Sequence, residues 1–551
     1  MTSGTRGSAA PGTPGGESSP GVSGARDSGG LPRLALDPGS WRSWDEEPRE
    51  PEHDEAYGAS LVRAAAKSGR DESVSTGEGT IEDRPVAVMS GNFGFLGGSI
   101  GQAAAARLVR CAERATERRL PLLACTASGG TRMQEGAPGF TAALGVTAAV
   151  ARHRDAGLPY LVYLRNPTFG GVLATWASLG WPVLAEPGAA IGFLGPRPYA
   201  ALGGTGDPRA TQTAENLAAH DLIDAVVPPK DLRAVLGGLL SGLPGGGPRG
   251  TTTPGTPAKE QPDPGRSPAG SDAWESIAAS RRPDRPGLRQ VLGSGTVTWL
   301  AGGLTAGIAG EVTADDTDDP PGSPLAVGTA RIGGHRCVVV GQDRSVPKSR
   351  PLGPAALRRA QRAIAAAGAL GLPLVTLIDT AGAELTQAAE EGGVAFEIAR
   401  CVDAMLRLPV PTVAVLLGQG AGGGAIALAA ADRLIALEHS WLAPLAPEGA
   451  SAIVHGHPDR AAELARGQRI SAGELLSRGI ADTVLPEPAA FTGGITAAVA
   501  RALDELTGPD RPAPAGSQAG GRAGNQAGNR GNTRYARFRR LAEPEPPEAR
   551  R

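Results

Sequence analysis

The chain has 551 residues, a formal net charge of −2 at pH 7 and an aromatic content of only 4%. This balance gives no basic field for nucleic-acid binding, and the few aromatics exclude stacking platforms for single strands. No apolar run approaches the ~20 residues that a membrane span requires, and the N-terminus lacks an apolar signal core. The four cysteines are isolated from one another, so we expect reduced thiols in a cytoplasmic protein with neither nucleic-acid nor membrane partners.

Three segments are rich in Gly, Pro, Ser and charge and lack apolar periodicity. Such compositions cannot bury enough apolar surface to offset the entropy of ordering the chain. We therefore predict disorder at 1–32, a flexible linker at 243–285 and a disordered tail at 507–551, in which the arginine-rich stretch 534–540 is solvated. Two folded domains remain, at 33–242 and 286–506, each long enough for its own core.

In the first of these domains, short apolar runs alternate with helical periodicity. The helix predicted after the first glycine-rich turn places Ala104, Leu108, Cys111 and Ala115 on one face. The run that follows it is apolar almost throughout, as expected for a strand covered on both faces of a sheet. We predict, in chain order, strand 85–89, helix 102–118, strand 120–125, helix 138–152, strand 160–164, a helix ending at 179 and strand 182–185.

The second domain repeats this alternation. Its predicted elements are strand 337–340, helix 355–367, strand 374–378, helix 394–406, strand 412–417 and strand 433–437. Alternating strands and helices are typical of an α/β fold, so we expect both halves to belong to that class.

The two halves are related at a constant offset of 252 residues. Leu120–Leu122 recurs as Leu372–Leu374, and Gly170–Gly171 recurs as Gly422–Gly423. Two superposable domains in one chain suggest a site built between related surfaces. Glycines, rather than acids or histidines, mark the matching positions.

A glycine between a strand and a helix lets the backbone approach a ligand closely. It also leaves the unpaired N–H groups of the helix start facing that ligand. Such a turn favours an anion or an oxyanion that develops during a reaction. A single glycine turn is more often only a tight turn, but paired turns at matching places in two repeats favour a ligand site.

One motif suggests a different function. Residues 418–423 fit the G-x-G-x-x-G fingerprint of dinucleotide-binding proteins, and Glu438 follows at a suitable distance. This turn is not in the first strand–helix unit of its domain, and its counterpart at 166–171 lacks the fingerprint. We therefore disfavour a dehydrogenase, and the absence of G-x-x-x-x-G-K-[ST] disfavours a P-loop ATP site.

A set of runs along both halves carries a resemblance to a known family. These runs are Phe95–Gly101, Ala127–Glu135, Leu158–Tyr160, Asn166–Gly171, Ala185–Pro187, Ile191–Arg197, Gly371–Pro373, Leu377–Ala383, Leu408–Thr412, Leu437–Trp441 and Ala446–Gly449. With them the chain resembles the carboxyltransferase component of acetyl-CoA carboxylase. Residues from about 33 to 240 look like its β subunit and those from about 285 to 505 like its α subunit, fused in that order, so the resemblance covers most of the predicted folded chain.

The resemblance implies two crotonase-like domains (ClpP/crotonase ββα superhelix) in tandem. It also implies transfer of a carboxyl group from carboxybiotin, carried on a separate protein, to acetyl-CoA to give malonyl-CoA. The thioester enolate and the ureido oxygen of biotin gain negative charge, so two oxyanion holes of backbone N–H groups suit this reaction. Biotin's own nitrogen can take the α-proton, which is consistent with the scarcity of histidines that could act as a base.

The family's motif positions imply roles for individual residues. By this comparison Gly129 and Gly130 supply one oxyanion hole, and Gly393 and Val394 supply the other. Substrate contacts are assigned by the same comparison to five residues: Gly170, Gly171, Gly422, Gly423 and Arg132.

The resemblance also implies partners. No lysine has the Met-Lys-Met context of a biotinylation site and no ATP-grasp features are visible, so a biotin carboxyl carrier protein and a biotin carboxylase are expected as separate partners in an ATP-dependent complex of fatty acid synthesis. Many β subunits carry a zinc ribbon with two CxxC pairs, which this chain lacks, so we predict no zinc. The family often builds its site across protomers, which implies a dimer or a larger homo-oligomer.

Four alternatives stay open on the sequence. In the first, the molecule that accepts the carboxyl group is propionyl-CoA or another acyl-CoA instead of acetyl-CoA. In the second, the chain belongs to the malonyl-decarboxylating branch of the superfamily. A non-catalytic paralogue that only assembles with carboxylase subunits is a third reading. A crotonase-type hydratase is the fourth; it needs paired carboxylates, for which Glu390 and Glu391 are weak candidates, more consistent with a solvated helix start.

Overall fold

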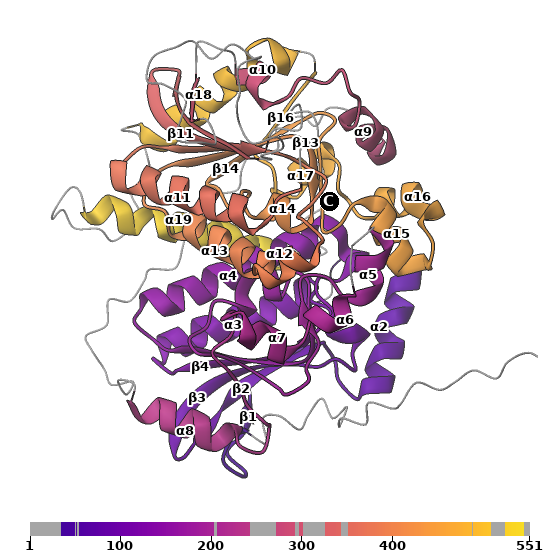
Figure 1. The fold of residues 1–551 in the computed structure, drawn as a ribbon, viewed down its shortest axis with the longest axis vertical. Coiled ribbons are helices and arrows are strands. Elements are labelled where there is room, and N and C mark those ends of the chain that lie inside the picture. Colours follow the sequence, from indigo (N-terminus) through magenta and orange to yellow (C-terminus); the bar gives the residue numbers. More distant parts are fainter. Residues whose placement is uncertain are drawn as a thin grey trace, which may run out of the picture.

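The computed structural model describes residues 35–49, 51, 54–202, 207–242, 272–292, 297–300, 325–342, 351–487, 489–508 and 524–544. The predicted disordered segment 1–32, most of the predicted linker and parts of the predicted tail lie outside these ranges. Two mixed sheets, one above the other in Figure 1, form the two halves of the molecule. Each sheet lies inside one of the two predicted domains.

The first sheet has the strand order β1-β2-β3-β4-β5-β6-β8, and β7 pairs with β5. Its strands are β1 (Arg42–Ser43), β2 (Val74–Ile81), β3 (Arg84–Gly91), β4 (Leu122–Ser128), β5 (Tyr160–Phe169), β6 (Val183–Ala185), β7 (Ile191–Gly192) and β8 (Ala225–Val226). The helices of this half are α2 (Glu55–Ser68), η1 (Leu96–Gly98), α3 (Gln102–Glu117), η2 (Met133–Glu135), α4 (Gly136–Asp155), η3 (Leu173–Ala177), α5 (Pro196–Ala201), α6 (Pro208–Thr211), α7 (Ala214–Ala219) and α8 (Leu232–Gly242).

The second sheet has the order β16-β14-β13-β12-β11-β10-β9, and β15 pairs with β13. Its strands are β9 (Val297–Leu300), β10 (Leu325–Ile332), β11 (His335–Gln342), β12 (Leu374–Thr380), β13 (Thr412–Ala421), β14 (Arg433–Leu437), β15 (Trp441–Ala443) and β16 (Thr483–Leu485). The helices are α9 (Ala273–Ser280), α10 (Leu288–Leu292), α11 (Pro354–Leu370), α12 (Gln387–Glu391), α13 (Val394–Arg407), α14 (Gly422–Ile426), α15 (Pro447–His455), η4 (Pro458–Arg460), α16 (Ala461–Gly467), α17 (Ala472–Ser477), η5 (Ala489–Thr492), α18 (Gly494–Thr507) and α19 (Gly524–Ala542).

The structure confirms the internal repeat down to its irregularities. Strands β4 and β5 pair in parallel with a register shift between Thr126 and Ser128, and β12 and β13 have the same shift between Ile378 and Thr380. Isolated bridges also recur in the two halves, Ile100 with Thr131 and Leu352 with Ala383. Each of these pairs obeys the offset read from the sequence. The predicted class, two α/β domains of the same architecture, is therefore confirmed.

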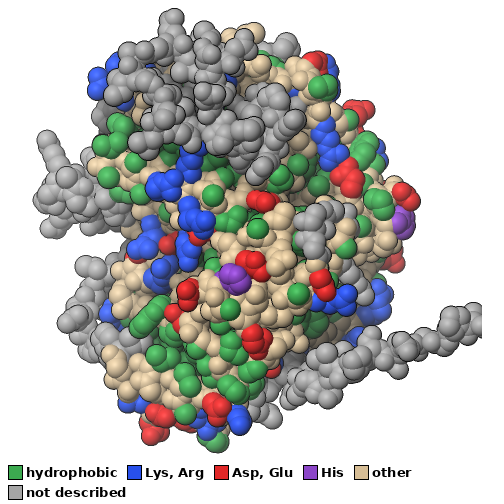
Figure 2. Space-filling model, viewed as in Figure 1, with side chains coloured by type: hydrophobic (Ala, Val, Ile, Leu, Met, Phe, Trp, Pro, Cys, Tyr) green, Lys and Arg blue, Asp and Glu red, His purple; other side chains and the backbone are tan. Residues whose placement is uncertain are grey.

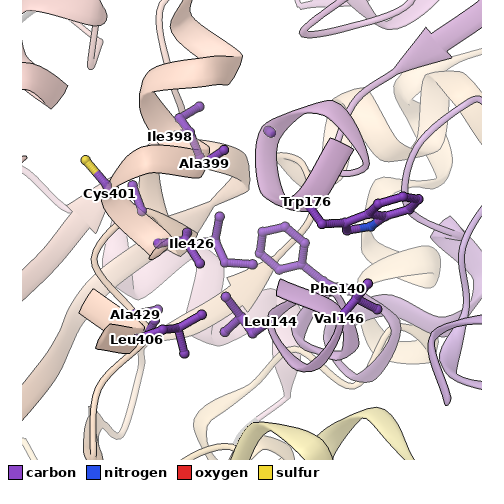
Figure 3. Packing of buried hydrophobic residues seen from close by; sticks show 14 of the residues in the cluster. Phe140, Leu144, Val146, Trp176, Ile398, Ala399, Cys401, Leu406, Ile426 and Ala429 are labelled. Carbon is purple, nitrogen blue, oxygen red and sulfur yellow. The ribbon is translucent and has the colours of Figure 1, made fainter. Parts of the chain in front are cut away.

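The two halves share a continuous apolar interface. Helices α4 and η3 of the first half pack against α13 of the second, between the two sheets (Figure 1). Figure 3 shows Phe140 and Leu144 of α4 facing Ile426 and Leu406 of the second half. These side chains belong to one buried cluster that includes residues of both halves. Burial of apolar area stabilises a packed arrangement by about 25 cal/mol per Å². This interface therefore holds the two halves in a fixed arrangement relative to each other.

Charged groups at the edge of this interface also connect the halves. Arg154 of α4 pairs with Asp403 of α13 at 3.2 Å, and Arg407 pairs with Asp155 at 2.5 Å. All four side chains are partly exposed, so each pair adds little to stability. Figure 2 shows basic and acidic side chains over both halves of one face, in keeping with the small net charge.

The predicted disordered tail contains a packed helix. Helix α19 lies against α4 (Figure 1), and its Arg534 is fully buried. The Arg534 guanidinium donates to both carboxylate oxygens of Asp432, at 3.1 and 2.9 Å, and to the carbonyls of Leu408 and Val410. The prediction of a solvated arginine stretch is thus wrong here. The composition of the tail does not show that carbonyl groups just after the end of α13 lie where a guanidinium can donate to them.

Part of the predicted linker is also ordered. Helix α9 lies inside 243–285, and Asp272 caps it by accepting from Trp274 N–H at 2.8 Å. The buried indole of Trp441 donates to Ser280 Oγ at 3.0 Å, which fixes the end of α9 on the second half. The residues before 272 in this predicted linker lie outside the described ranges.

One buried histidine gives a pH-dependent prediction. His153 lies inside the first half, where its Nε2–H donates to the Pro159 carbonyl at 3.1 Å. Burial lowers the pKa of His153 to about 4, while an unfolded histidine has a pKa of about 6.5. Below pH 6.5 the unfolded chain therefore binds a proton that the folded chain does not. Stability is full above pH 6.5 and falls as the pH drops toward 4, by up to ~1.4 kcal/mol per pH unit.

The measurement is urea unfolding at pH 7 and pH 5 for the wild type and for His153→Gln. We expect the free energy of unfolding to fall more steeply with acidification in the wild type than in the variant. The variant is less stable at pH 7 because it disturbs a packed site, so the comparison is between slopes. Equal slopes would mean that His153 is not held neutral in the folded protein.

Candidate active site

A large pocket lies between the two halves of the chain. Its volume is about 1440 Å³, and both repeats contribute to its walls. The first repeat supplies the turns after β4 and β5 and the segment after β7. The second supplies the turns after β12 and β13 and part of α15. Its lining includes Gly97, Ser99, Gly129, Thr131, Phe140, Gly170, Gly171, Phe193, Leu194, Gln342, Asp379, Thr380, Gly382, Glu384, Gln419, Gly422, Gly423, Ile426, Ile453 and Val454.

The Gly–Gly turn of the first half lies at the pocket wall. Gly170 has φ +68°, a conformation that favours glycine, and it opens the turn from β5 into η3. A Cβ on Gly130 would lie 3.2 Å from the Gly170 Cα, so the two turns touch through their main chains. Gly171 has an ordinary φ, but a Cβ there would lie 2.6 Å from Thr131 Oγ1. Close packing, rather than backbone strain, therefore requires glycine at 171.

The Gly171 N–H is the clearest donor of this turn. Within the described ranges it has no hydrogen-bond acceptor, whereas the neighbouring Gly170 N–H donates to the Gly192 carbonyl at 3.3 Å. An amide at the wall of a pocket with no internal partner can bind an incoming oxygen.

The matching turn of the second half has the same geometry. Gly422 has φ +57°, and Gly422 and Gly423 are the first residues of α14, where N–H groups have no partner within the helix. Gln342 supports this turn from β11: its Nε2 donates to the Gly424 carbonyl at 2.7 Å, and its Oε1 accepts from Asp379 N–H at 3.0 Å. Both Gly–Gly pairs thus line one pocket.

Gly129 and Gly130 do not present free amides. The Gly129 N–H donates to the Gly97 carbonyl at 2.8 Å, and the Gly130 N–H donates to Ser128 Oγ at 3.0 Å. The second half repeats the latter contact, since Gly382 N–H donates to Thr380 Oγ1 at 3.1 Å. Gly129 lines the pocket, but because both amides already have acceptors within the protein, the structure gives no support to the predicted role of Gly129 and Gly130 as an oxyanion hole. These bonds serve instead to shape the turn that touches Gly170.

Gly393 and Val394 are not at the pocket. The Gly393 N–H donates to the Glu390 carbonyl at 2.9 Å, and a Cβ on Gly393 would meet Leu222. Val394 begins α13 and is fully buried in the apolar cluster. This turn packs against the first half instead of opening toward the pocket, so the structure gives no support to their predicted role as donors.

Arg132 is a buried structural group. It is 1% exposed and forms an ion pair with Glu72 at 2.5 Å, and it donates to the Ser99 carbonyl at 2.8 Å. Its guanidinium is fully occupied by protein acceptors and it does not line the pocket. The predicted substrate contact is therefore not seen. Arg132 instead fixes the loop that carries Ser99, which does line the pocket.

Glu390 and Glu391 do not form a catalytic carboxylate pair at the pocket. Glu390 accepts from Phe193 N–H and Gln212 Nε2, and burial raises its pKa. Glu391 accepts from Gln387 Nε2 at 3.0 Å. The expectation of a solvated helix start is thus wrong for Glu390, since the first half covers it. Neither carboxylate lines the pocket, so the pair named for the hydratase alternative is not at this site.

Sequence reasoning missed several pocket residues. Phe193, Phe140 and Ile426 give the pocket apolar walls, and Gln342 holds the second donor turn. At the offset of 252 residues, Gln342 corresponds to Ser90 of the first repeat. A comparison of the two repeats in the sequence would therefore have identified Gln342 as a difference between the halves. Across the described ranges, no cluster of three or more His, Cys, Asp or Glu side chains is placed to hold a metal ion. Likewise no helix there combines the length and the apolar character needed to cross a bilayer.

The fold and the pocket define a class of protein: a tandem pair of related α/β domains whose glycine turns share one ligand site. The chain belongs to the carboxyl transferase family. It matches that family's description, "Carboxyl transferase domain", over residues 33–483.

Two sequence relatives support this membership. The chain is 47% identical over 492 residues to a protein of Mycobacterium tuberculosis (strain ATCC 25618 / H37Rv) named "Probable biotin-dependent acyl-coenzyme A carboxylase beta3 subunit", covering 87% of this chain and 95% of that one. It is 37% identical over 482 residues to "Acetyl-coenzyme A carboxylase carboxyl transferase subunits beta/alpha" of Salinispora arenicola (strain CNS-205), covering 83% and 82%. A crystal structure of the transcarboxylase 12S hexamer matches 89% of this chain and 91% of its own, at 22% identity and a TM-score of 0.35.

Proposed function

We propose that this protein transfers a carboxyl group from carboxybiotin, presented by a carrier protein, to an acyl-CoA, with acetyl-CoA as the acceptor and malonyl-CoA as the product. The observation that carries the proposal is the pair of repeat-related Gly–Gly turns, Gly170–Gly171 and Gly422–Gly423, at the wall of one pocket. The reaction creates negative charge at two oxygens, and each turn can supply amide donors for one of them.

The donors proposed are the amides of Gly171 and Gly423. The Gly171 N–H has no acceptor among the described residues, and the Gly423 N–H is near the start of a helix. These amides are held by packed main chain, so they need no reorganisation when charge develops. One turn would stabilise the enolate oxygen of the thioester and the other the ureido oxygen of biotin.

The pocket supports a mechanism without a side-chain base. Its lining, as far as the structure describes it, contains no His, Lys, Arg or Cys. Asp379 Oδ1 accepts from the Gln419 N–H at 2.9 Å, and Glu384 Oε1 accepts from Thr386 Oγ1 at 3.1 Å. Asp379 is thus held by the end of β13, and Glu384 is held by its own loop. The biotin nitrogen released as the carboxyl group leaves is then available to accept the α-proton of the acyl group.

The size of the pocket fits two substrates. Pockets for one small ligand usually have volumes of about 300–1,000 Å³, and this one has about 1440 Å³. The intact donor turns argue against the non-catalytic paralogue. A longer acyl-CoA is a second candidate acceptor, favoured by the apolar walls formed by Phe140, Phe193 and Ile426. The relative named as an acyl-CoA carboxylase subunit supports the same candidate.

Partners are part of the proposal. The carrier protein and the biotin carboxylase are separate chains, as the names of the relatives as carboxylase subunits also suggest. The pocket described above is lined by both halves of a single chain. We propose that the protein works as a homo-oligomer, at least a dimer, in the cytoplasm.

The test is the reverse reaction. Purified protein is mixed with malonyl-CoA or methylmalonyl-CoA and free biotin, and loss of the acyl-CoA carboxyl group is followed. We expect biotin-dependent loss, faster with malonyl-CoA if acetyl-CoA is the natural acceptor. Faster loss of methylmalonyl-CoA would select the longer acceptor. No biotin-dependent loss with either compound would refute carboxyl transfer and favour the non-catalytic paralogue.

A further inference from the structure

A carboxylate of the second half binds main chain of the first half beside the pocket. Glu390 of α12 accepts from Phe193 N–H, at 3.1 Å to each of its carboxylate oxygens, and from Gln212 Nε2 at 2.6 Å. Gln212 is 2% exposed, and its Nε2 also donates to the Leu194 carbonyl at 2.8 Å. Phe193 and Gln212 are buried and Glu390 is partly buried, so water competes only weakly for these hydrogen bonds. The segment 193–194 is therefore held by the opposite half.

The side chain of Phe193 contacts the second half at the Gly422–Gly423 turn. A Cβ built on Gly423 would lie 2.9 Å from two ring carbons of Phe193 and 2.6 Å from Ile398 Cδ1. The ring therefore packs directly on the Gly423 main chain, and Ile398 closes the other side. Phe193 and Leu194 also line the pocket. A displacement of Phe193 would thus remove one of the two walls that keep Gly423 in place.

We propose that Glu390 is a positioning residue for carboxyl transfer: it holds the Phe193 amide, so that the Phe193 ring fixes Gly423. The inference rests on the proposed function, because that function makes Gly423 an oxyanion donor. Both oxygens of a carboxylate accept hydrogen bonds, and the groups that face Glu390, Phe193 N–H and Gln212 Nε2–H, are donors. A carboxylate therefore matches its partners at this position. Glutamine would present its own NH₂ group to one of these donors.

The same helix offers a matched control. Glu391 follows Glu390, but its carboxylate accepts from Gln387 Nε2 and lies 4.0 Å from His220 Nε2. It is partly exposed and does not line the pocket. Glu391→Gln makes the same chemical change as Glu390→Gln, one residue away and outside the contact with Phe193.

The experiment compares Glu390→Gln with Glu391→Gln and Phe193→Leu in the full chain. The first measurement is ¹⁹F NMR after labelling the eight phenylalanines with 4-fluorophenylalanine. The signal lost in Phe193→Leu belongs to Phe193. The second is kcat and KM for biotin-dependent loss of malonyl-CoA. For Glu390→Gln we expect a shifted Phe193 signal and a kcat about tenfold lower, with KM changed less than about twofold, because the loss falls on the transition state.

Phe193→Leu, which removes the ring but leaves the carboxylate, should reproduce the loss of kcat. Glu391→Gln should leave both readouts unchanged. An unmoved Phe193 signal in Glu390→Gln, a normal kcat despite a moved signal, or a normal kcat in Phe193→Leu would each overturn the inference. If the wild type itself shows no biotin-dependent transfer, the proposed function fails, and the positioning role that depends on it fails too. The NMR signal would then report only on the contact between Glu390 and Phe193.

Discussion

Removal of the Gly171 N–H is expected to lower kcat for carboxyl transfer by about 10²–10³-fold, the usual effect of deleting one oxyanion donor. The variant is Gly171→Pro in a Thr131→Ala background. The second substitution is needed because any Cβ at 171 would lie 2.6 Å from Thr131 Oγ1. With the hydroxyl removed, the new ring gains space, and the missing N–H becomes the main difference. The measurement is the biotin-dependent loss of malonyl-CoA.

The matched control is Gly171→Ala in the same Thr131→Ala background. It adds a Cβ but keeps the N–H, and the φ of Gly171 is one that alanine can adopt. We expect this control to keep kcat within about tenfold of the wild type, because the donor is retained. Equal activity of the proline and alanine variants would show that the Gly171 amide does not act in catalysis. Gel filtration of both variants checks that the fold and the oligomer are intact.

Arg534→Ala is expected to lower the free energy of unfolding by about 3–5 kcal/mol, since breaking a buried ion pair leaves an uncompensated charge. Arg534 is fully buried and Asp432 nearly so. Burial alone would raise the pKa of Asp432, but the Arg534 guanidinium holds it below the ordinary value. In the variant, the Thr412 N–H and hydroxyl, both at 2.9 Å, remain as donors to this carboxylate. Urea unfolding followed by circular dichroism measures the loss.

The control for this prediction lies in the same helix. Arg539 pairs with Glu113 at 2.6 Å, but both side chains are partly exposed. Arg539→Ala should therefore cost less than about 1 kcal/mol. A loss of similar size in both variants would mean that Arg534 contributes only as part of α19 docking and not through its buried charge. Because α19 contacts Glu113 in the first half and Asp432 in the second, unfolding of both halves should be affected.

Much of the fold could be predicted from local patterns. The apolar runs that become β4, β5, β12 and β13 are buried on both faces, and such strands are apolar throughout. The repeat then placed two Gly–Gly turns at matching strand ends. The packed helix in the tail was not predicted, because its residues are mostly polar and small. Its order comes from Tyr535, Phe538 and Leu541, which join the buried apolar cluster, and from Arg534, which satisfies distant carbonyls and Asp432.

Two related α/β halves, with Gly170–Gly171 and Gly422–Gly423 in equivalent turns, could be predicted from the sequence alone. Apolar periodicity, glycine positions and the internal repeat are properties of the sequence, so they can be recognised without coordinates. Which backbone amides lack an acceptor, in contrast, depends on the three-dimensional packing. The Gly129 N–H is taken by the Gly97 carbonyl, while the Gly171 N–H meets no acceptor in the described structure. A hydrogen bond depends on the partner that packing brings to a donor, and that partner comes from elsewhere in the chain.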